Sequence, residues 1–312
     1  MATLRFFRSN QPYSFTWFVP ERGFEIASAF EADLIGERSA KPFTCLIDRS
    51  PIGISKGIAS SPLRNKTGLF KTFAALPKGD NESSILEFAN SHGPLDRGSS
   101  GPIGKTVILQ RPKRGESASP HYAEPLAAWG AQIGLMKWLV RVWDAVSRRE
   151  QPFLKHFIRW DQDRVIANMD PSLPDCPWAT KMETIAGAEI GDPRMWSKLK
   201  HGDLLDPTML YLQRNINKQV TEFPSQSRLL WDNGRPFLFI EPTNLIGALW
   251  LQFAQAVDGD REYRVCEECR EWFEIGGSKK KDGHGVDHHR TDARFCKAAC
   301  KQKAYRAAKE KK

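Results

Sequence analysis

Two closely spaced cysteine pairs near the end of the chain, Cys266-Glu267-Glu268-Cys269 and Cys296-Lys297-Ala298-Ala299-Cys300, decide most of what the sequence predicts. Two residues between the first sulfurs allow both to lie in one tight turn. Three residues between the second sulfurs place both on the same side of a helical turn. A turn and a helix of this kind form one tetrahedral site, which four thiolates at about 2.3 Å complete for Zn²⁺. The sequence therefore predicts one structural zinc ion per chain, held by Cys266, Cys269, Cys296 and Cys300.

Other interpretations of this segment stay open at the level of sequence. The cysteines could be ordinary reduced residues on a hairpin and a helix, although two short-spaced pairs seldom coincide without a metal. His284, His288 and His289 could bind a second or a catalytic metal ion, since histidine-rich loops do so. Their Gly- and Lys-rich surroundings favour solvated histidines instead. Few apolar residues lie between the two pairs, so the metal must supply much of the folding free energy of this segment.

Basic charge gathers in the same part of the chain. The whole chain has 312 residues and a formal net charge of +9, with 46 Lys and Arg against 37 Asp and Glu. Residues 261–312 hold 15 basic and 9 acidic residues, which is 15 − 9 = +6 of that excess. Beyond Cys300 the chain is rich in Ala and free of Gly and Pro, so the sequence predicts that the helix begun at the cysteines continues.

A basic helix held by a metal site could lie along the phosphates of a nucleic acid. We expect Lys297, Lys301 and Lys312 on one side of this helix with Tyr305, and Lys303, Arg306 and Lys309 on the other. The predicted phosphate contacts are Lys297, Lys301, Lys303, Arg306 and Lys309. Phosphate contacts alone carry no sequence preference. The same residues could equally form a solvated helix that keeps the protein soluble.

The segments 264–273 and 290–306 resemble the treble-clef zinc fingers that close many bacterial proteins, including the CGNR-type finger proteins. In those families a cysteine pair is followed by an aromatic residue, an arginine-containing turn, and an aromatic-Cys pair that opens a basic helix. This chain departs from the CGNR pattern where Lys301-Gln302-Lys303 replaces Gly-Asn-Arg, and its central loop is longer. Because CGNR proteins are regarded as DNA-binding regulators, the resemblance implies nucleic-acid binding, DNA first, and a role in transcription regulation.

Residues 1–259 predict an α+β body ahead of the zinc module at 260–312. Aromatic and β-branched segments between Pro and Gly favour strands over about 1–120, and helical periodicity dominates about 121–259. The strongest predicted helix spans about 124–149, where large apolar residues recur at spacings of three and four: Leu126, Trp129, Ile133, Met136, Val140 and Trp143. Shorter helices are predicted near 85–89, 207–220 and 245–257, and hairpins at 158–169 and at 228–240 around Asn233-Gly234.

Several functional classes are disfavoured. No stretch approaches the roughly 20 apolar residues that span a bilayer, and the N-terminus lacks a secretory apolar core, so we expect a cytoplasmic protein. Residues 100–106 are not a phosphate loop, because Ser99 stands where Gly is required and a strand-like run follows. Candidate catalytic side chains are isolated and lack metal-binding spacing: Asp161, Asp163, Glu183, His92 and His121. We therefore expect no enzymatic activity.

Taken together, these patterns predict a zinc-containing, non-enzymatic protein that binds nucleic acid. The alternative is a protein-interaction or small-ligand-binding protein whose zinc module is a structural cap. The sequence leaves open DNA against RNA, the recognised sequence, the oligomeric state and the role of residues 1–259.

Overall fold

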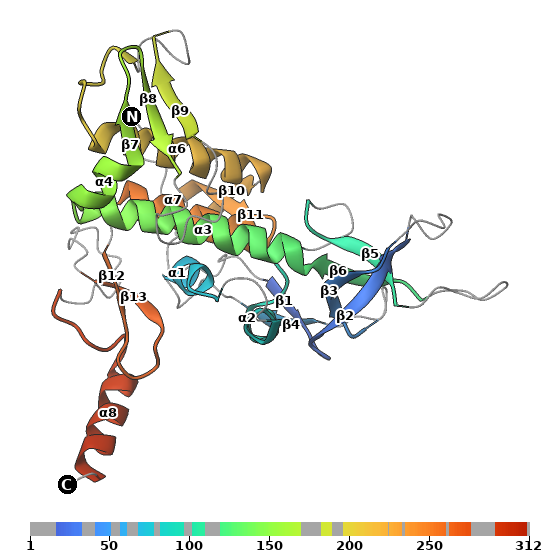
Figure 1. The fold of residues 1–312 in the computed structure, drawn as a ribbon. Helices are drawn as coiled ribbons and strands as arrows, with labels where there is room; N and C mark the ends of the chain where they lie inside the picture. The colour runs from blue at the N-terminus through green and yellow to red at the C-terminus, as the bar shows by residue number, and fades with distance from the viewer. Residues whose placement is uncertain are drawn as a thin grey trace. The chain divides into compact units, whose positions relative to one another are not determined.

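The computed structural model of the chain is a mixed α and β protein that divides into two compact units (Figure 1). The first unit comprises Met1–Gly130 and Glu222–Lys312, and the second comprises Ala131–Thr221. The predicted boundary at residue 259 lies inside the first unit, and separate folding of residues 260–312 stays a prediction. The structure describes residues 17–32, 41–50, 57–60, 68–77, 82–96, 102–109, 119–169, 182–188, 196–223, 225–232, 235–259, 262–275 and 291–310.

A small closed barrel is the main β structure of the first unit. Its strands are β2 (Phe24–Glu31), β3 (Phe43–Asp48), β5 (Lys105–Ile108) and β6 (His121–Pro125), in the order β2-β3-β6-β5, with all pairs antiparallel. Small and β-branched side chains fill its interior, where little volume is available: Ala29, Cys45, Ile47, Val107 and Ala123. Burial raises the pKa of the Cys45 thiol to about 12, which makes this cysteine an inert packing residue.

Short helices and aromatic side chains build the rest of this core. Strands β1 (Trp17–Pro20) and β4 (Gly57–Ser60) pair, β1 lies against α2 (Glu82–His92), and α1 (Leu69–Ala74) precedes α2 in the chain. The Phe73 ring lies 5.4 Å from Phe88 and 6.1 Å from Trp129, between ring centroids. Helix α7 (Leu245–Asp258) adds fully buried aromatic residues and begins at Asn244, whose side chain accepts a hydrogen bond of 2.8 Å from the Gly247 N–H. Asn244 is therefore the N-cap of α7.

The buried carboxylate of Glu124 joins three parts of the first unit. It accepts hydrogen bonds from the backbone N–H groups of Leu95 and Asp96 at 3.0 and 2.6 Å, from the Tyr122 hydroxyl at 2.7 Å, and from Trp129 Nε1 at 2.8 Å. Asp96 in turn accepts from Asn244 Nδ2 at 3.2 Å, so the network reaches the start of α7. Burial outweighs these hydrogen bonds and raises the pKa of Glu124 to about 7.

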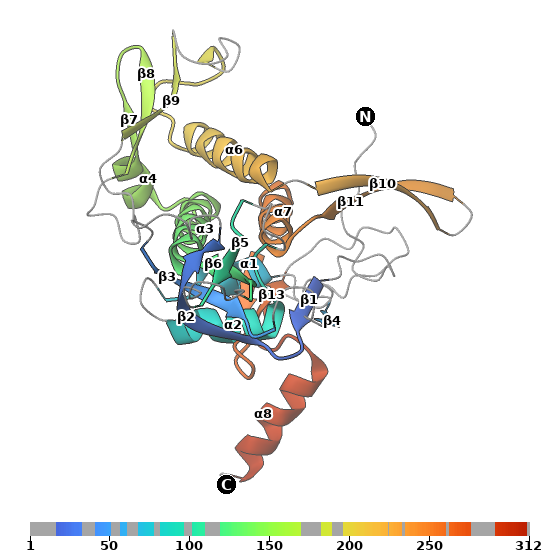
Figure 2. The ribbon, with the colours of Figure 1, turned by 90° about the vertical axis from the view of Figure 1, so that its right-hand side faces the viewer.

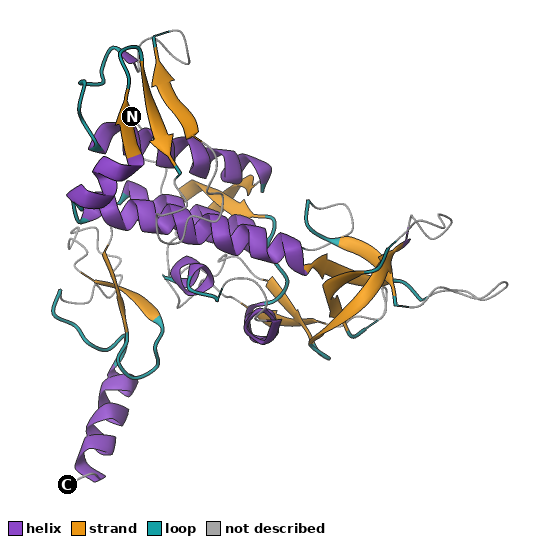
Figure 3. Cartoon of the chain, viewed as in Figure 1, coloured by secondary structure: helices purple, strands orange, loops and turns teal. Residues whose placement is uncertain are grey.

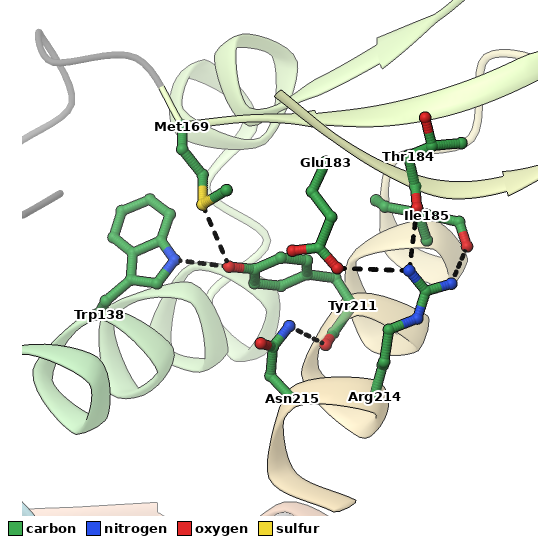
Figure 4. Close-up of polar contacts among 8 residues, drawn as sticks. All are labelled: Trp138, Met169, Glu183, Thr184, Ile185, Tyr211, Arg214 and Asn215. Atoms are coloured by element: carbon green, nitrogen blue, oxygen red, sulfur yellow. Dashed lines mark hydrogen bonds and ion pairs between the residues drawn. The ribbon is translucent and has the colours of Figure 1, made fainter. Parts of the chain in front are cut away.

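The second unit holds the larger part of α3 (Leu126–Ser147), together with α4 (Gln151–Phe157), α6 (Leu205–Glu222) and the antiparallel sheet β7 (Ile158–Trp160), β8 (Arg164–Asn168) and β9 (Met182–Gly187). Figure 4 shows the hydrogen bonds by which Tyr211 and Arg214 of α6 contact the other elements of the second unit. The Tyr211 hydroxyl accepts from Trp138 Nε1 at 3.0 Å and donates to Met169 Sδ at 3.5 Å. Arg214 donates to the backbone carbonyls of Thr184 and Ile185 and contacts Glu183 at 3.3 Å, which covers the edge of β9.

Most strongly patterned elements lie where the sequence predicts them. The apolar stripe of α3 is buried at every predicted position from Trp129 to Trp143, and β7 and β8 form the predicted hairpin. Helix α2 covers the helix predicted near 85–89, and β10 pairs with β11 in the hairpin predicted at 228–240. Helix α1 and strand β9 were not predicted. None of the helices in the described part of the chain is long and apolar enough to cross a membrane.

We predict that Glu124 makes the folded state less stable as the pH rises from about 4.5 to about 7. The folded protein holds a proton on this carboxyl over that range and the unfolded chain does not, so raising the pH favours unfolding. The loss reaches at most about 3 kcal/mol, at 1.36 kcal/mol per pH unit of difference. Urea unfolding of the intact chain across this pH range measures it.

Glu124→Gln is the control for this effect. Its amide oxygen can accept on one side only, and its NH2 group would face the donors that now meet the other carboxylate oxygen, so we expect lower stability at pH 5 together with a flatter dependence on pH. An unchanged slope in this variant would show that other groups set the pH response.

Candidate metal centre

The first cysteine pair lies in the turn of a short hairpin. Strands β12 (Glu262–Val265) and β13 (Trp272–Ile275) pair as an antiparallel hairpin (Figure 3). Cys266 follows directly after β12. The Cys266 N–H donates to Glu271 O at 2.9 Å, and the Arg270 N–H donates to Cys266 O at 3.0 Å. Arg270 has a φ of 62°, the left-handed conformation that closes this turn and that a non-glycine residue adopts at some expense.

The second cysteine pair lies at the start of α8 (Ala298–Glu310). Cys300 is in the first turn of this helix and Cys296 lies just ahead of it, as the spacing predicts. Glu267 and Arg294 make two of the contacts that join this half of the site to the hairpin. The Glu267 N–H donates to Arg294 O at 3.1 Å, and the two side chains form a bidentate ion pair with both N···O distances at 2.6 Å. The ion pair is exposed and thus adds little stability, but it aligns the two halves.

All four cysteine sulfurs converge. The Sγ atoms of Cys266, Cys269, Cys296 and Cys300 lie within 4.8 Å of one another. Cys269 Sγ and Cys296 Sγ are 3.5 Å apart, and Cys296 Sγ and Cys300 Sγ are 3.7 Å apart. Sulfurs at the corners of a tetrahedron with metal bonds of about 2.3 Å lie about 3.8 Å apart. The separations therefore fit a metal ion at the centre of the cluster and are far too long for disulfides.

Backbone donors favour a negative charge on this cluster. Burial opposes ionisation of Cys266, but hydrogen bonds from the backbone of Cys269, Cys296 and Glu268 outweigh it and lower the pKa of Cys266 to about 6. Burial raises the pKa of Cys296 and of Cys300, and the neighbouring sulfurs add to this effect for Cys296. A divalent cation would let the remaining thiols ionise, because its charge offsets the repulsion among the thiolates.

The module around the sulfurs has a very small apolar core. Cys266 and Cys300 are buried with Phe273 and Ile275, and Phe295 packs at the side of this cluster. Cys269 is exposed. So few apolar side chains cannot hold a hairpin and a helix together unaided, in agreement with the prediction that a metal supplies much of the local stability.

The hairpin also packs on α1 through aromatic side chains. Lys71, of which 5% is exposed, places its Nζ 5.0 Å from the centroid of the Trp272 ring and 5.6 Å from that of Tyr263. The Phe70 ring lies edge-on to Tyr263 at 5.4 Å and stacks on Phe253 of α7 at 5.2 Å. Cysteine ligands, hairpin and body core thus form one continuous set of contacts within the first unit.

The remaining predicted site residues separate into distinct groups. Lys297, Lys301, Lys303, Arg306 and Lys309 are all exposed. Asp161 forms ion pairs with Arg159 and Arg164, and Glu183 forms one with Arg214. His92 packs on Phe88 with 4.6 Å between ring centroids, and His121 Nδ1 lies 3.2 Å from Asp48 O. Asp163 is exposed. His284, His288, His289 and Cys176 lie outside the described residues.

The sequence did not indicate the residues that attach the metal module, residues 262–275 and 291–310, to the rest of the first unit. Lys71 occurs in the apolar run Leu69-Phe70-Lys71-Thr72-Phe73, where a buried lysine beneath two aromatic rings has no local signature. Glu268 was also missed, although its carboxylate lies 2.9 Å from Lys303 Nζ and connects the first cysteine turn to α8. An acidic residue between paired cysteines opposite a basic helix is the one signal that could have indicated this contact.

Comparison of the chain with protein-family models, with curated proteins and with solved structures finds no match. The resemblance to CGNR-type fingers therefore has no independent support.

We predict about one Zn²⁺ per chain, because four thiolates at these separations complete its coordination shell. Native mass spectrometry of the intact chain measures the stoichiometry. Cys300→Ser should lose most of the zinc, whereas Cys45→Ser, which changes a cysteine inside the barrel, should keep it. A metal-free native protein, or full zinc in Cys300→Ser, contradicts this assignment.

We predict that Gly68→Ala destabilises the protein by about 1 to 3 kcal/mol. The Gly68 backbone, with φ −108°, accepts alanine, but a Cβ there would lie 2.6 Å from Trp272 Cβ. The added methyl group therefore acts by pushing the hairpin off α1. Because the hairpin packs on α1, chelation of the metal should also lower the melting temperature of the whole first unit. The destabilisation that Gly68→Ala causes should be smaller in the presence of a chelator.

Gly130→Ala is the matched control in thermal denaturation. A Cβ at this helical position meets no atom within 4 Å, so the change should raise stability by up to about 1 kcal/mol. Equal effects of the two substitutions would show that the contact between Gly68 and Trp272 does not hold the module.

Proposed function

We propose that this chain is a zinc-containing, non-enzymatic protein that binds nucleic acid through α8, with DNA as the first candidate. The observation that carries this proposal is an exposed basic helix whose first turn holds a ligand of the metal centre. Hairpin, second cysteine pair and helix follow one another as in a treble-clef finger, and we infer that fold for residues 262–310. Zinc would fix the direction of α8, so that its cations contact phosphates without the entropy loss of ordering a free tail.

The basic residues of α8 differ in how much of their charge is free for a ligand. Lys303 forms an ion pair with Glu268, and this contact raises the pKa of Lys303. Among the ion pairs of the described residues, none takes Lys297, Lys301, Arg306 or Lys309. These four are the stronger candidates for phosphate contacts, and Lys303 serves first to hold α8 against the cysteine turn.

Helical spacing gives one side of α8 a mixed basic and aromatic character. Lys301, Tyr305 and Lys309 follow one another at intervals of four residues, so they share a face of the helix, which corrects the expectation that Lys309 lies opposite Lys301. Tyr305 is 64% exposed, and Lys301 Nζ lies 5.9 Å from the centroid of its ring. Exposed aromatic rings between cations suit stacking on sugars or bases beside phosphate contacts.

We predict that replacing Lys301, Arg306 and Lys309 together by Ala weakens binding to all sequences alike. It should also flatten the slope of log K against log salt by up to about three units, near one for each lost contact. Fluorescence anisotropy with duplex DNA, duplex RNA and single strands at several salt concentrations measures both quantities. Zinc content and melting temperature should hardly change.

Two control variants make this test specific. Lys155→Ala with Lys198→Ala and Lys200→Ala removes the same charge from exposed residues of the second unit and should leave the slope unchanged. Lys303→Ala should have a smaller effect than Arg306→Ala, because Lys303 is already paired. Binding that is undetectable at low salt, or equally weakened by both triple variants, would favour the alternative of a protein-interaction module.

A further inference from the structure

The hairpin of β10 (Ser225–Asp232) and β11 (Arg235–Pro242) forms a separate two-stranded sheet in the first unit (Figure 2). Asp232 pairs with Arg235, with two residues between them in the chain, and the pairing continues to Ser225 with Pro242. In a hairpin with a two-residue turn, the closing pair exchanges backbone hydrogen bonds, and bonded and non-bonded pairs then alternate. Residues 225, 227, 229 and 231 therefore direct their N–H and C=O groups away from β11.

Proline distinguishes the two edges of this hairpin. Pro236 and Pro242 occupy non-bonded positions of β11, opposite Trp231 and Ser225. A proline there costs no hydrogen bond within the hairpin but removes an N–H from the outer edge, which blocks the addition of a further strand. Strand β10 contains no proline, so its outer edge keeps every donor and acceptor. Apart from β11, no strand of the described part of the chain pairs with β10.

The same strand exposes large apolar side chains. Leu229 is 72% exposed and Trp231 is 66% exposed, the two highest values among the described large apolar residues. Alternation along a strand places both on one face of the hairpin. An isolated two-stranded hairpin is marginally stable in water, whereas three or more strands with an apolar face are stable. An open edge beside exposed Leu and Trp side chains is the arrangement that strand addition would complete.

We propose that β10 pairs with β10 of a second copy of this chain, antiparallel, around a two-fold axis at Leu230. This register places Arg228 opposite Asp232 of the second copy, and Asp232 opposite its Arg228. Leu229 pairs with Trp231 of the second copy on both sides of the axis, at positions whose backbone groups are directed outward. Each complementary pair thus occurs twice, as an isologous interface requires.

Neighbouring registers lack this complementarity. An axis at Leu229 places Arg228 opposite Leu230 and leaves Asp232 opposite Gln226. An axis at Arg228 places two arginines opposite each other, which is unfavourable for directly opposed like charges. The Leu230 register joins the two hairpins into a four-stranded sheet in which both outer strands are β11, with its prolines at the outer edges. Such a sheet ends with the second copy and does not grow further.

Sedimentation equilibrium of the intact, zinc-loaded chain from about 1 to about 100 µM tests for the dimer. Arg228→Asp places two acidic residues opposite each other twice, and Asp232→Arg does the same with basic residues. Each variant alone should raise the dissociation constant about tenfold or more. Mixed in equal amounts, the two variants should form a heterodimer, because both pairs are again of opposite charge. This rescue is specific to the register and cannot arise from misfolding of either variant.

Leu229→Pro tests the edge itself. It removes an outward N–H but no hydrogen bond to β11, as Pro236 does in the natural sequence, so the melting temperature of the monomer should be retained while dimerisation is lost. A chain that stays monomeric at about 100 µM overturns the proposal. So does a dimer that Leu229→Pro leaves intact, or a variant mixture that pairs no better than the single variants. None of these results bears on nucleic-acid binding by α8, which the anisotropy experiment tests separately.

Discussion

The convergence of four cysteine sulfurs within 4.8 Å is the constraint on which the end of the chain depends. Thiolates this close repel one another. A cation bound between all four would offset this repulsion and form a bond to each sulfur. The apolar residues around the sulfurs are too few to replace that cation. Hydrogen bonds from the backbone prepare the site, since they hold the pKa of Cys266 near 6 against its burial. A metal ion bound at this cluster would therefore fix the orientation of α8 relative to the hairpin.

The metal module is continuous with the core of the first unit. Tyr263 and Trp272, on the two strands that lead into and out of the first cysteine turn, cover Lys71 and Phe70 of α1, and Phe70 stacks on Phe253. A buried ammonium between two aromatic rings is stabilised by their negative faces, but its solvation is lost if the hairpin is misplaced. Metal loss should consequently be felt beyond residues 262–310. The composition of residues 260–312 suggested a separate finger. The contacts of its hairpin with α1 join segments far apart in the chain and so cannot be predicted from local composition.

Local chemistry decided which parts of the fold could be predicted. The hairpin of β10 and β11, helix α7, the stripe of α3 and both cysteine spacings are set by residues close together in the chain, and each was predicted from the sequence. Closure of the barrel was not, because pairs such as Phe30 with Ile108 join segments far apart in the chain. The short helix α1 and the strand β9 lack a periodic pattern long enough to stand out. For the same reason, Glu124 gave no sign that it would be buried among four protein donors.

A strongly raised pKa often marks a catalytic carboxyl group, but Glu124 differs from that pattern. Its two oxygens already accept hydrogen bonds from the protein, on Oε1 from Asp96 and Tyr122 and on Oε2 from Leu95 and Trp129, so they have little capacity left for a substrate. The fold therefore satisfies the Glu124 carboxyl group. Chemistry that a partner could satisfy lies on the surface, in the cations of α8 and in the outward backbone groups of β10. Phosphates would satisfy the first and a second strand the second, which is why both proposals are about binding.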